Sequence, residues 1–125
     1  MNIQKYKSKI VSADEAVKVI KSGDKIVLHA NNCFPELLVD SLCKRYQELN
    51  DVEFAHLTIF QKPKYLDPLM EGHFRHNALF TSGSVRKAVN EGKADFTPVF
   101  LHEIPLLYES GRLKVDVVFL HLSCP

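Results

Sequence analysis

The stretch Val115–Leu122, VDVVFLHL, contains an unbroken run of four apolar residues from Val117 to Leu120. A short unbroken apolar run of this kind is typical of a β-strand that is covered on both faces, and such strands belong to parallel sheets. Earlier stretches at Lys25–Leu28 and Val52–Phe60 are also rich in apolar residues. We therefore expect a parallel sheet that includes all three segments.

Helical patterns separate these strands. Ser12 and Glu15 have the spacing of a capping box, and they precede an apolar stripe that Gly23 ends. The other predicted elements are a helix after Pro35 that buries Leu37, Leu38, Leu42, Tyr46 and Leu49, an irregular segment Gln61–His76 with a short helix near Leu69–His73, strands at Ala78–Phe80 and Phe96–Leu101, and helices at Ser84–Glu91 and Ile104–Ser110.

The alternation of strands and helices predicts right-handed crossovers and an open, mostly parallel α/β sheet with helices on both faces. In such a sheet, ligands bind beyond the carboxyl ends of the strands. The loops that would carry a site are Ala30–Phe34, Phe60–Lys64, Thr81–Ser84, Leu101–Glu103 and Leu122–Pro125.

Composition narrows the class of protein. The chain has 125 residues, 46% of them hydrophobic and 25% charged, with a formal net charge of +1. These values fit one globular domain, and so small a net charge argues against a nucleic-acid or membrane partner bound by bulk electrostatics. We expect no signal peptide, because no apolar stretch follows the lysines of segment 1–9. Three widely spaced cysteines, Cys33, Cys43 and Cys124, form no disulfide framework, so we expect a cytoplasmic location.

Two loops contain the candidate binding residues. Asn31 and Asn32 end the first strand, and their amides are able to hydrogen-bond a carboxylate or an acyl oxygen; equally, asparagines adopt left-handed backbone angles in tight turns. Ser82, Gly83 and Ser84 lie where a strand turns into a helix, whose amides attract anions; the simpler interpretation is that Ser84 caps the helix and Gly83 makes the turn. We expect both loops at one edge of the sheet.

Other polar residues carry weaker signals. His73 and His76 are spaced to share a helix face, but no further ligands accompany them, so we expect no metal. His102 and Glu103 form a possible acid/base pair, although Glu103 suits the N-terminus of a helix equally well. Cys33 has no neighbouring base and is expected to be a small buried thiol rather than a nucleophile.

Taken in order, several segments resemble the acetyl-CoA hydrolase/transferase family, which includes 4-hydroxybutyrate CoA-transferases. The resemblance covers nearly the whole chain, and it depends on the ordered set rather than on one motif. Its segments are Lys9–Val17, Ile20–Val27, Met70–Phe80, Ser82–Gly92, Ala94–Pro98, His102–Pro105 and Val115–Val117.

The resemblance implies the α/β fold of class I CoA-transferases and the transfer of CoA from an acyl-CoA to a carboxylic acid through a glutamyl-CoA thioester. It implies no cofactor beyond the CoA substrate. The small net charge already argues against a membrane or nucleic-acid partner, and we expect a homo-oligomer, because a domain cut after its Val115–Leu122 strand exposes an edge strand and an apolar flank. Family members are longer two-domain proteins whose catalytic glutamate lies in the second domain. Because no glutamate here matches that motif, we expect residues 1–125 to be a truncated N-terminal domain, inactive alone, with the nucleophile beyond Pro125 and with Asn31, Asn32, Ser82, Gly83 and Ser84 as substrate-binding residues.

One departure from the family leaves the substrate open. The loop after the first strand commonly contains glycine in the family, whereas here it reads NNCFP over Asn31–Pro35, which would shrink or re-polarise an acyl pocket. The alternative function is a sugar-phosphate isomerase or deaminase that binds phosphate at Ser82–Ser84, although no acid/base carboxylate stands near that turn. A receiver-type signalling domain is a poor third, because the first strand ends in His29–Asn32 rather than in acidic residues.

Overall fold

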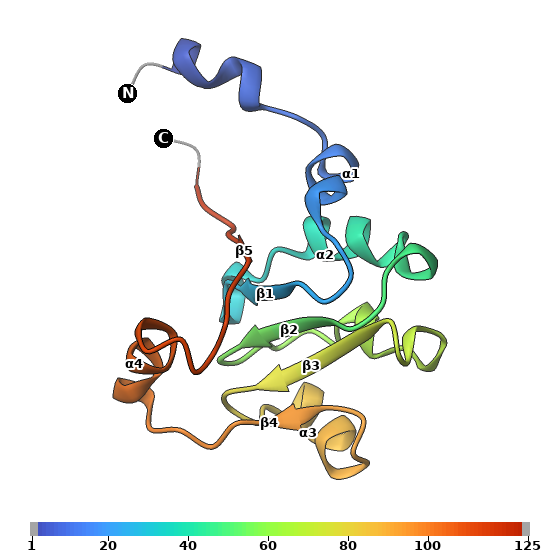
Figure 1. Ribbon diagram of the computed structural model, residues 1–125, viewed down its shortest axis with the longest axis vertical. Coiled ribbons are helices and arrows are strands. Elements are labelled where there is room, and N and C mark those ends of the chain that lie inside the picture. The colour runs from blue at the N-terminus through green and yellow to red at the C-terminus, as the bar shows by residue number, and fades with distance from the viewer. Residues whose placement is uncertain (1–2, 124–125) are drawn as a thin grey trace.

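The computed structural model describes residues 3–123, and it contains a five-stranded sheet in the order β4-β3-β2-β1-β5, in which every neighbouring pair is parallel (Figure 1). This confirms the predicted sheet. The strands are β1 (Lys25–Leu28), β2 (Val52–His56), β3 (Phe74–Ala78), β4 (Asp95–Phe96) and β5 (Val117–Phe119), the α-helices are α1 (Ala13–Ala16), α2 (Glu36–Cys43), α3 (Gly83–Asn90) and α4 (Ile104–Glu109), and 3-10 turns lie at Ile3–Lys9, Val17–Val19, Asn31–Cys33, Tyr46–Glu48, Lys64–Leu66, Pro68–Met70 and Leu101–Glu103.

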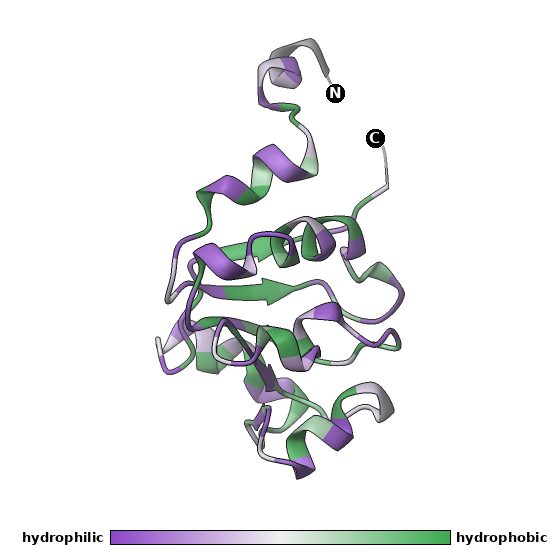
Figure 2. Cartoon of the chain, turned by 90° about the vertical axis from the view of Figure 1, so that its right-hand side faces the viewer, coloured by the Kyte–Doolittle hydropathy of each residue, from purple (hydrophilic) through white to green (hydrophobic). Residues whose placement is uncertain are grey.

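The core lies on the face of the sheet that α2 and α3 cover. Register places Ile26, Phe54 and His76 side by side on this face, and all three are fully buried. Val39 and Leu42 of α2 belong to the same buried cluster, which also includes Val85 of α3. Figure 2 shows the hydrophobic residues concentrated along the strands at the centre of the sheet. Burial of this apolar face is the main stabilising contribution.

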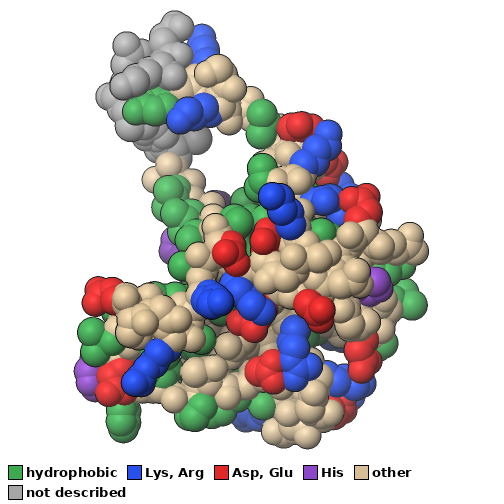
Figure 3. Space-filling model, in the orientation of Figure 1, with side chains coloured by type: hydrophobic (Ala, Val, Ile, Leu, Met, Phe, Trp, Pro, Cys, Tyr) green, Lys and Arg blue, Asp and Glu red, His purple; other side chains and the backbone are tan. Residues whose placement is uncertain are grey.

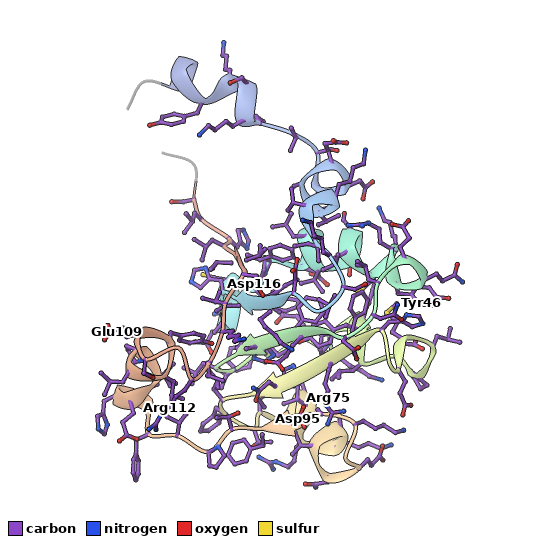
Figure 4. All side chains as sticks on the ribbon, viewed as in Figure 1. Tyr46, Arg75, Asp95, Glu109, Arg112 and Asp116 are labelled. Atoms are coloured by element: carbon purple, nitrogen blue, oxygen red, sulfur yellow. The ribbon has the colours of Figure 1, made fainter. Side chains whose placement is uncertain are left out.

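The opposite face carries α4 and a row of charges. The Lys25 ammonium pairs with Glu53 at 3.4 Å, and Arg75 forms a two-bonded ion pair with Asp95 on the next strand; Figure 4 shows Arg75 and Asp95 side by side. Burial, with the Glu53 carboxylate nearby, raises the pKa of Tyr108 in α4. Acidic and basic side chains are interspersed over the view in Figure 3, and no helix among residues 3–123 is long and apolar enough to span a bilayer.

The predicted boundaries of four strands were wrong. The third strand was predicted at Ala78–Phe80 but runs over Phe74–Ala78, so it begins inside the segment Gln61–His76 that we expected to be irregular. The fourth was predicted at Phe96–Leu101, yet it has two residues: Thr97 still donates to the Ala78 carbonyl, and Pro98 then lacks the N–H needed to continue pairing. The second and fifth strands were also predicted too long, since they end at His56 and Phe119.

The helices confirm the predictions in part. Ser12 Oγ accepts from the Glu15 amide at 3.2 Å, as in a capping box, whereas the Glu15 carboxylate pairs with Lys18. The first helix then changes to a 3-10 turn at Val17–Val19. No α-helix forms near Leu69–His73, where the structure has 3-10 turns instead. Leu37 was predicted to be buried and is 72% exposed, because α2 presents Val39 and Leu42 to the core.

Candidate active site

The loops that follow β1, β2 and β3 are joined by hydrogen bonds at the carboxyl edge of the sheet. The backbone N–H of Asn31 donates to the backbone carbonyl of Thr58 at 2.8 Å, and the Thr58 hydroxyl donates to the side-chain oxygen Oδ1 of Asn31. The next residue, Ile59, accepts from the Ser84 hydroxyl at 2.8 Å. Thr58 and Ile59 therefore connect the loop that carries Asn31 and Asn32 to the turn Ser82–Ser84. This confirms that both lie at the same edge of the sheet.

Asn31 has a left-handed backbone, with φ of 56°. Asparagine tolerates this conformation better than most residues, so the turn requirement is real. The backbone turn leaves the side chain accessible to a ligand, because Asn31 and Asn32 are both exposed at the edge. The structure thus combines the two interpretations of this loop: Asn31 makes the turn, and its amide remains accessible.

A groove of about 490 Å³ opens between this loop and the chain that follows β5. Strand order reverses between β1 and β5, since the chain leaves β1 toward β2 and returns from β4 to the other side of β1. Ligand crevices in open α/β sheets form at such switch points. The groove has apolar walls and several polar side chains. The apolar residues are Phe34, Pro35, Leu37, Leu38 and Leu120, and the polar residues are Asn32, Glu36, Gln61 and His121.

A second, smaller hollow of about 240 Å³ is lined in part by Thr58. Thr58 contributes the single hydroxyl among its lining side chains. The rest of its wall is hydrocarbon, from Leu57, Leu79, Phe80, Val99, Leu101 and Ile104. An aliphatic group suits such a hollow, whereas a sugar does not.

The serine turn differs from the predicted cap. Ser82, not Ser84, is the N-cap of α3, and its carbonyl accepts from the Arg86 amide at 3.0 Å. Ser84 lies in the first turn, where its hydroxyl is 2.9 Å from the Ser82 hydroxyl and bonds to Ile59. Gly83 does not have a positive φ, so the turn does not require glycine for backbone reasons. Ser84 therefore braces one loop against another.

A buried polar cluster lies under this edge. The Tyr65 hydroxyl is 3.3 Å from His56 Nε2 and 3.1 Å from His76 Nδ1, and the three side chains are at most 2% exposed. Burial lowers the pKa of His56 to about 3, with the neighbouring His76 adding to the effect, and burial lowers the pKa of His76 to about 4. Both imidazoles are therefore neutral at physiological pH, which keeps uncompensated charge out of the core.

The remaining predicted residues lie apart. His73 and His76 share no helix: the His73 ring bonds to the Leu49 carbonyl at 2.7 Å, and no three His, Cys, Asp or Glu side chains in the described part of the chain gather as metal ligands would. Glu103 is the N-cap residue of α4, and the His102 ring stacks on Phe100. Cys33 is half-buried rather than buried; it and Cys43 are unbonded thiols, and Cys124 lies outside the described residues.

Sequence reasoning missed Thr58 because we extended the second strand to Phe60. The strand ends at His56, so the loop at its tip begins at Leu57. Gln61 lies in the loop Phe60–Lys64, which was expected to carry a site, but it was not among the predicted binding residues. Its Oε1 is buried and has no hydrogen-bond partner among residues 3–123. A shorter boundary for the second strand would have drawn attention to Thr58.

Comparison with known proteins identifies relatives of the whole chain. Residues 2–125 match the family described as the acetyl-CoA hydrolase/transferase N-terminal domain. A 4-hydroxybutyrate coenzyme A transferase from Clostridium kluyveri is 40% identical over 120 residues, which are 96% of this chain and 28% of that protein. The chain thus spans about a quarter of the length of this relative.

Solved structures share the fold. RipA from Yersinia pestis superposes with a TM-score of 0.77 at 18% identity, over 96% of this chain and 30% of that one. A 4-hydroxybutyrate CoA-transferase from Porphyromonas gingivalis superposes with a TM-score of 0.70 at 22% identity, over 95% of this chain and 26% of that one. The open parallel sheet is therefore an architecture that CoA-transferase structures share.

Proposed function

The chain belongs to the acetyl-CoA hydrolase/transferase family, and we propose that it forms the acyl side of an active site that transfers CoA from an acyl-CoA to a carboxylic acid. One observation carries the proposal: Thr58 bonds the exposed side-chain amide of Asn31 and also lines a hollow whose remaining wall is hydrocarbon. An acyl group has the same two parts, an oxygen that accepts hydrogen bonds and an aliphatic tail. Acetate, butyrate and 4-hydroxybutyrate are the size class that we propose.

The proposed reaction proceeds through a glutamyl-CoA thioester. A glutamate carboxylate attacks the acyl-CoA carbonyl and forms a mixed anhydride, releasing CoA thiolate. The thiolate then attacks the glutamyl carbonyl, which frees the first carboxylic acid and leaves the enzyme as a thioester. An incoming carboxylate reverses these steps and leaves as the new acyl-CoA. We propose that the nucleophile lies beyond Pro125, in a second domain, so that residues 1–125 are the N-terminal domain.

The candidate residues have distinct proposed roles. Asn31 and Asn32 donate hydrogen bonds to the acyl or carboxylate oxygen, where negative charge develops during transfer. Ser82, Gly83 and Ser84 line the same edge: the Ser84 hydroxyl braces the loop, while the α3 N-terminus favours an anion. The hydrocarbon wall of the hollow that Thr58 lines excludes water from the thioester. Hydrolase and transferase members would differ in how well this exclusion works.

Three further assignments belong to this proposal. The only cofactor-like molecule is CoA itself, which enters as a substrate thioester. The protein associates as a homo-oligomer, for which the exposed apolar side chains of Val118 on the edge strand and of Leu120 just after it offer contact area. The unbonded Cys33 and Cys43 fit a reducing cytoplasm.

The competing function is a sugar-phosphate enzyme that uses the amides at the start of α3. The two functions predict different responses in the ¹H–¹⁵N spectrum of the chain. We expect acetyl-CoA to shift the signals of Asn31, Asn32 and Thr58, with a sugar phosphate leaving them unchanged. Shifts confined to Gly83 and Ser84, produced by the sugar phosphate and not by acetyl-CoA, would contradict the proposed function.

A further inference from the structure

We propose that Thr58 is a positioning residue that holds Asn31 as a hydrogen-bond donor, so that this point of the edge selects the carboxylate oxygen of an aliphatic acid. The inference rests on the proposed function and deepens it. It holds that the Thr58 hydroxyl donates to Asn31 Oδ1, so that a ligand at Asn31 must accept a hydrogen bond from the side-chain nitrogen.

The Asn31 amide has two ends, and the structure uses one of them. The Thr58 hydroxyl donates to Oδ1, and the backbone amide of Asn31 donates to the Thr58 carbonyl at 2.8 Å. The two bonds fix both the left-handed backbone and the side chain. A carboxamide carries its acceptor on one atom and its two donor hydrogens on the other. With Oδ1 engaged by Thr58, the Nδ2 hydrogens remain.

Those hydrogens are available to a ligand. Asn31 is exposed, and no residue in the described range 3–123 accepts a hydrogen bond from Nδ2. A group bound at this point must therefore be an acceptor: a carboxylate or carbonyl oxygen satisfies it, and an ammonium does not. If Thr58 did not hold Oδ1, the amide would be free to turn and present its oxygen instead.

The surroundings of Thr58 supply the other half of the recognition. Thr58 lines the hollow whose remaining wall is hydrocarbon, formed by Leu57, Leu79, Phe80, Val99, Leu101 and Ile104. A ligand whose oxygen meets Asn31 is thus within reach of an aliphatic pocket. A short straight-chain monocarboxylate, with one acceptor end and one apolar end, matches this arrangement.

The test compares four chains for butyrate binding by ¹H–¹⁵N titration: wild type, Thr58→Val, Thr58→Ser and Thr97→Val. Thr97→Val is the matched control, because Thr97 also donates to an asparagine, Asn77, at 2.8 Å but lines neither hollow. Butylammonium serves as the control ligand with the same alkyl chain and the opposite charge. Thermal unfolding of each variant checks that it is folded.

We expect Thr58→Val to weaken butyrate binding about tenfold, the effect of one lost charge-assisted hydrogen bond. Thr58→Ser retains the hydroxyl and should bind butyrate like wild type, as should Thr97→Val, and these three chains, which all keep a hydroxyl at position 58, should not bind butylammonium. Equal butyrate affinity in wild type and Thr58→Val would overturn the inference and leave the proposed function standing. So would acetyl-CoA shifts at Asn31 without any butyrate binding. If neither acetyl-CoA nor butyrate binds the wild-type chain, the proposed function fails, and the inference fails with it.

Discussion

Incubation of the 125-residue chain with acetyl-CoA and butyrate is expected to produce no butyryl-CoA at an enzymatic rate. Transfer through a covalent intermediate needs a carboxylate nucleophile held against the thioester, with oxyanion donors fixed around it. Deleting such nucleophiles commonly lowers rates by on the order of 10⁴ to 10⁶. We expect a deficit of that size here, because the proposed nucleophile lies outside these residues.

The glutamates of the chain explain this expectation. Glu36 lines the larger groove, and Glu103 precedes Ile104, which lines the smaller hollow; the resemblance to the family assigns the nucleophile role to neither. Glu103 is half-buried at the start of α4, and Glu36 is exposed in the first turn of α2. The assay is paired with a borohydride trap for an enzyme-bound thioester. A trapped thioester on Glu36, Glu71, Glu91 or Glu103, or turnover at an ordinary rate, would show that the chain carries its own nucleophile.

Acid should destabilise the fold well above the pH at which carboxylates titrate. The pKa values of His56 and His76 are lowered to about 3 and about 4, from 6.5 for an unperturbed histidine. Below pH 6.5 the unfolded chain therefore binds protons that the folded chain rejects, so the free energy of unfolding falls as the pH falls. At pH 5 the loss is about 2 kcal/mol for each histidine. The two together remove a large share of the stability of a typical domain.

Urea unfolding at pH 7 and pH 5 measures this loss. Replacement of His56 by Gln, which does not titrate, should remove about half of the pH dependence, since His56 is one of two such groups. Replacement of the exposed His102 by Gln is the control and should leave it unchanged. In the folded wild-type chain, the rings of His56 and His76 should stay mostly unprotonated down to pH 5. Titration of either ring near pH 6.5 would contradict the buried, neutral cluster.

The elements that could be predicted are those whose sequence pattern lies within a few consecutive residues. The apolar runs that became β1, β2 and β5 are visible in a few consecutive residues, and with the intervening helices they predicted a parallel sheet. Strand β3 was misplaced because Arg75, His76 and Asn77 make it look polar. His76 is buried there against Tyr65, which lies eleven residues away in a 3-10 turn and whose hydroxyl meets its ring. No short sequence window contains that partner.

The position of the candidate site at the carboxyl edge could be predicted, but the hydrogen bonds that build it could not. The topology rule located the carboxyl edge, and with it Asn31, Asn32 and the serine turn. The bonds that join these loops, from Asn31 to Thr58 and from Ser84 to Ile59, span more than twenty residues each and leave no periodic pattern. The switch-point groove depends on β5 returning beside β1, and that pairing too is set by tertiary packing. Residue type alone therefore suggested ligands without showing which atoms remain free to bind one.

The most direct test of the central claim is CoA transfer by a chimaera. Residues 1–125 would replace the matching segment of the Clostridium kluyveri 4-hydroxybutyrate coenzyme A transferase, which is 40% identical over this region. If these residues form the acyl side of a CoA-transferase site, the folded chimaera transfers CoA from acetyl-CoA to butyrate or 4-hydroxybutyrate, and Asn31→Ala in the chimaera lowers that rate at least tenfold. A folded chimaera that binds CoA but transfers none, or one whose rate is indifferent to Asn31→Ala, would contradict the account.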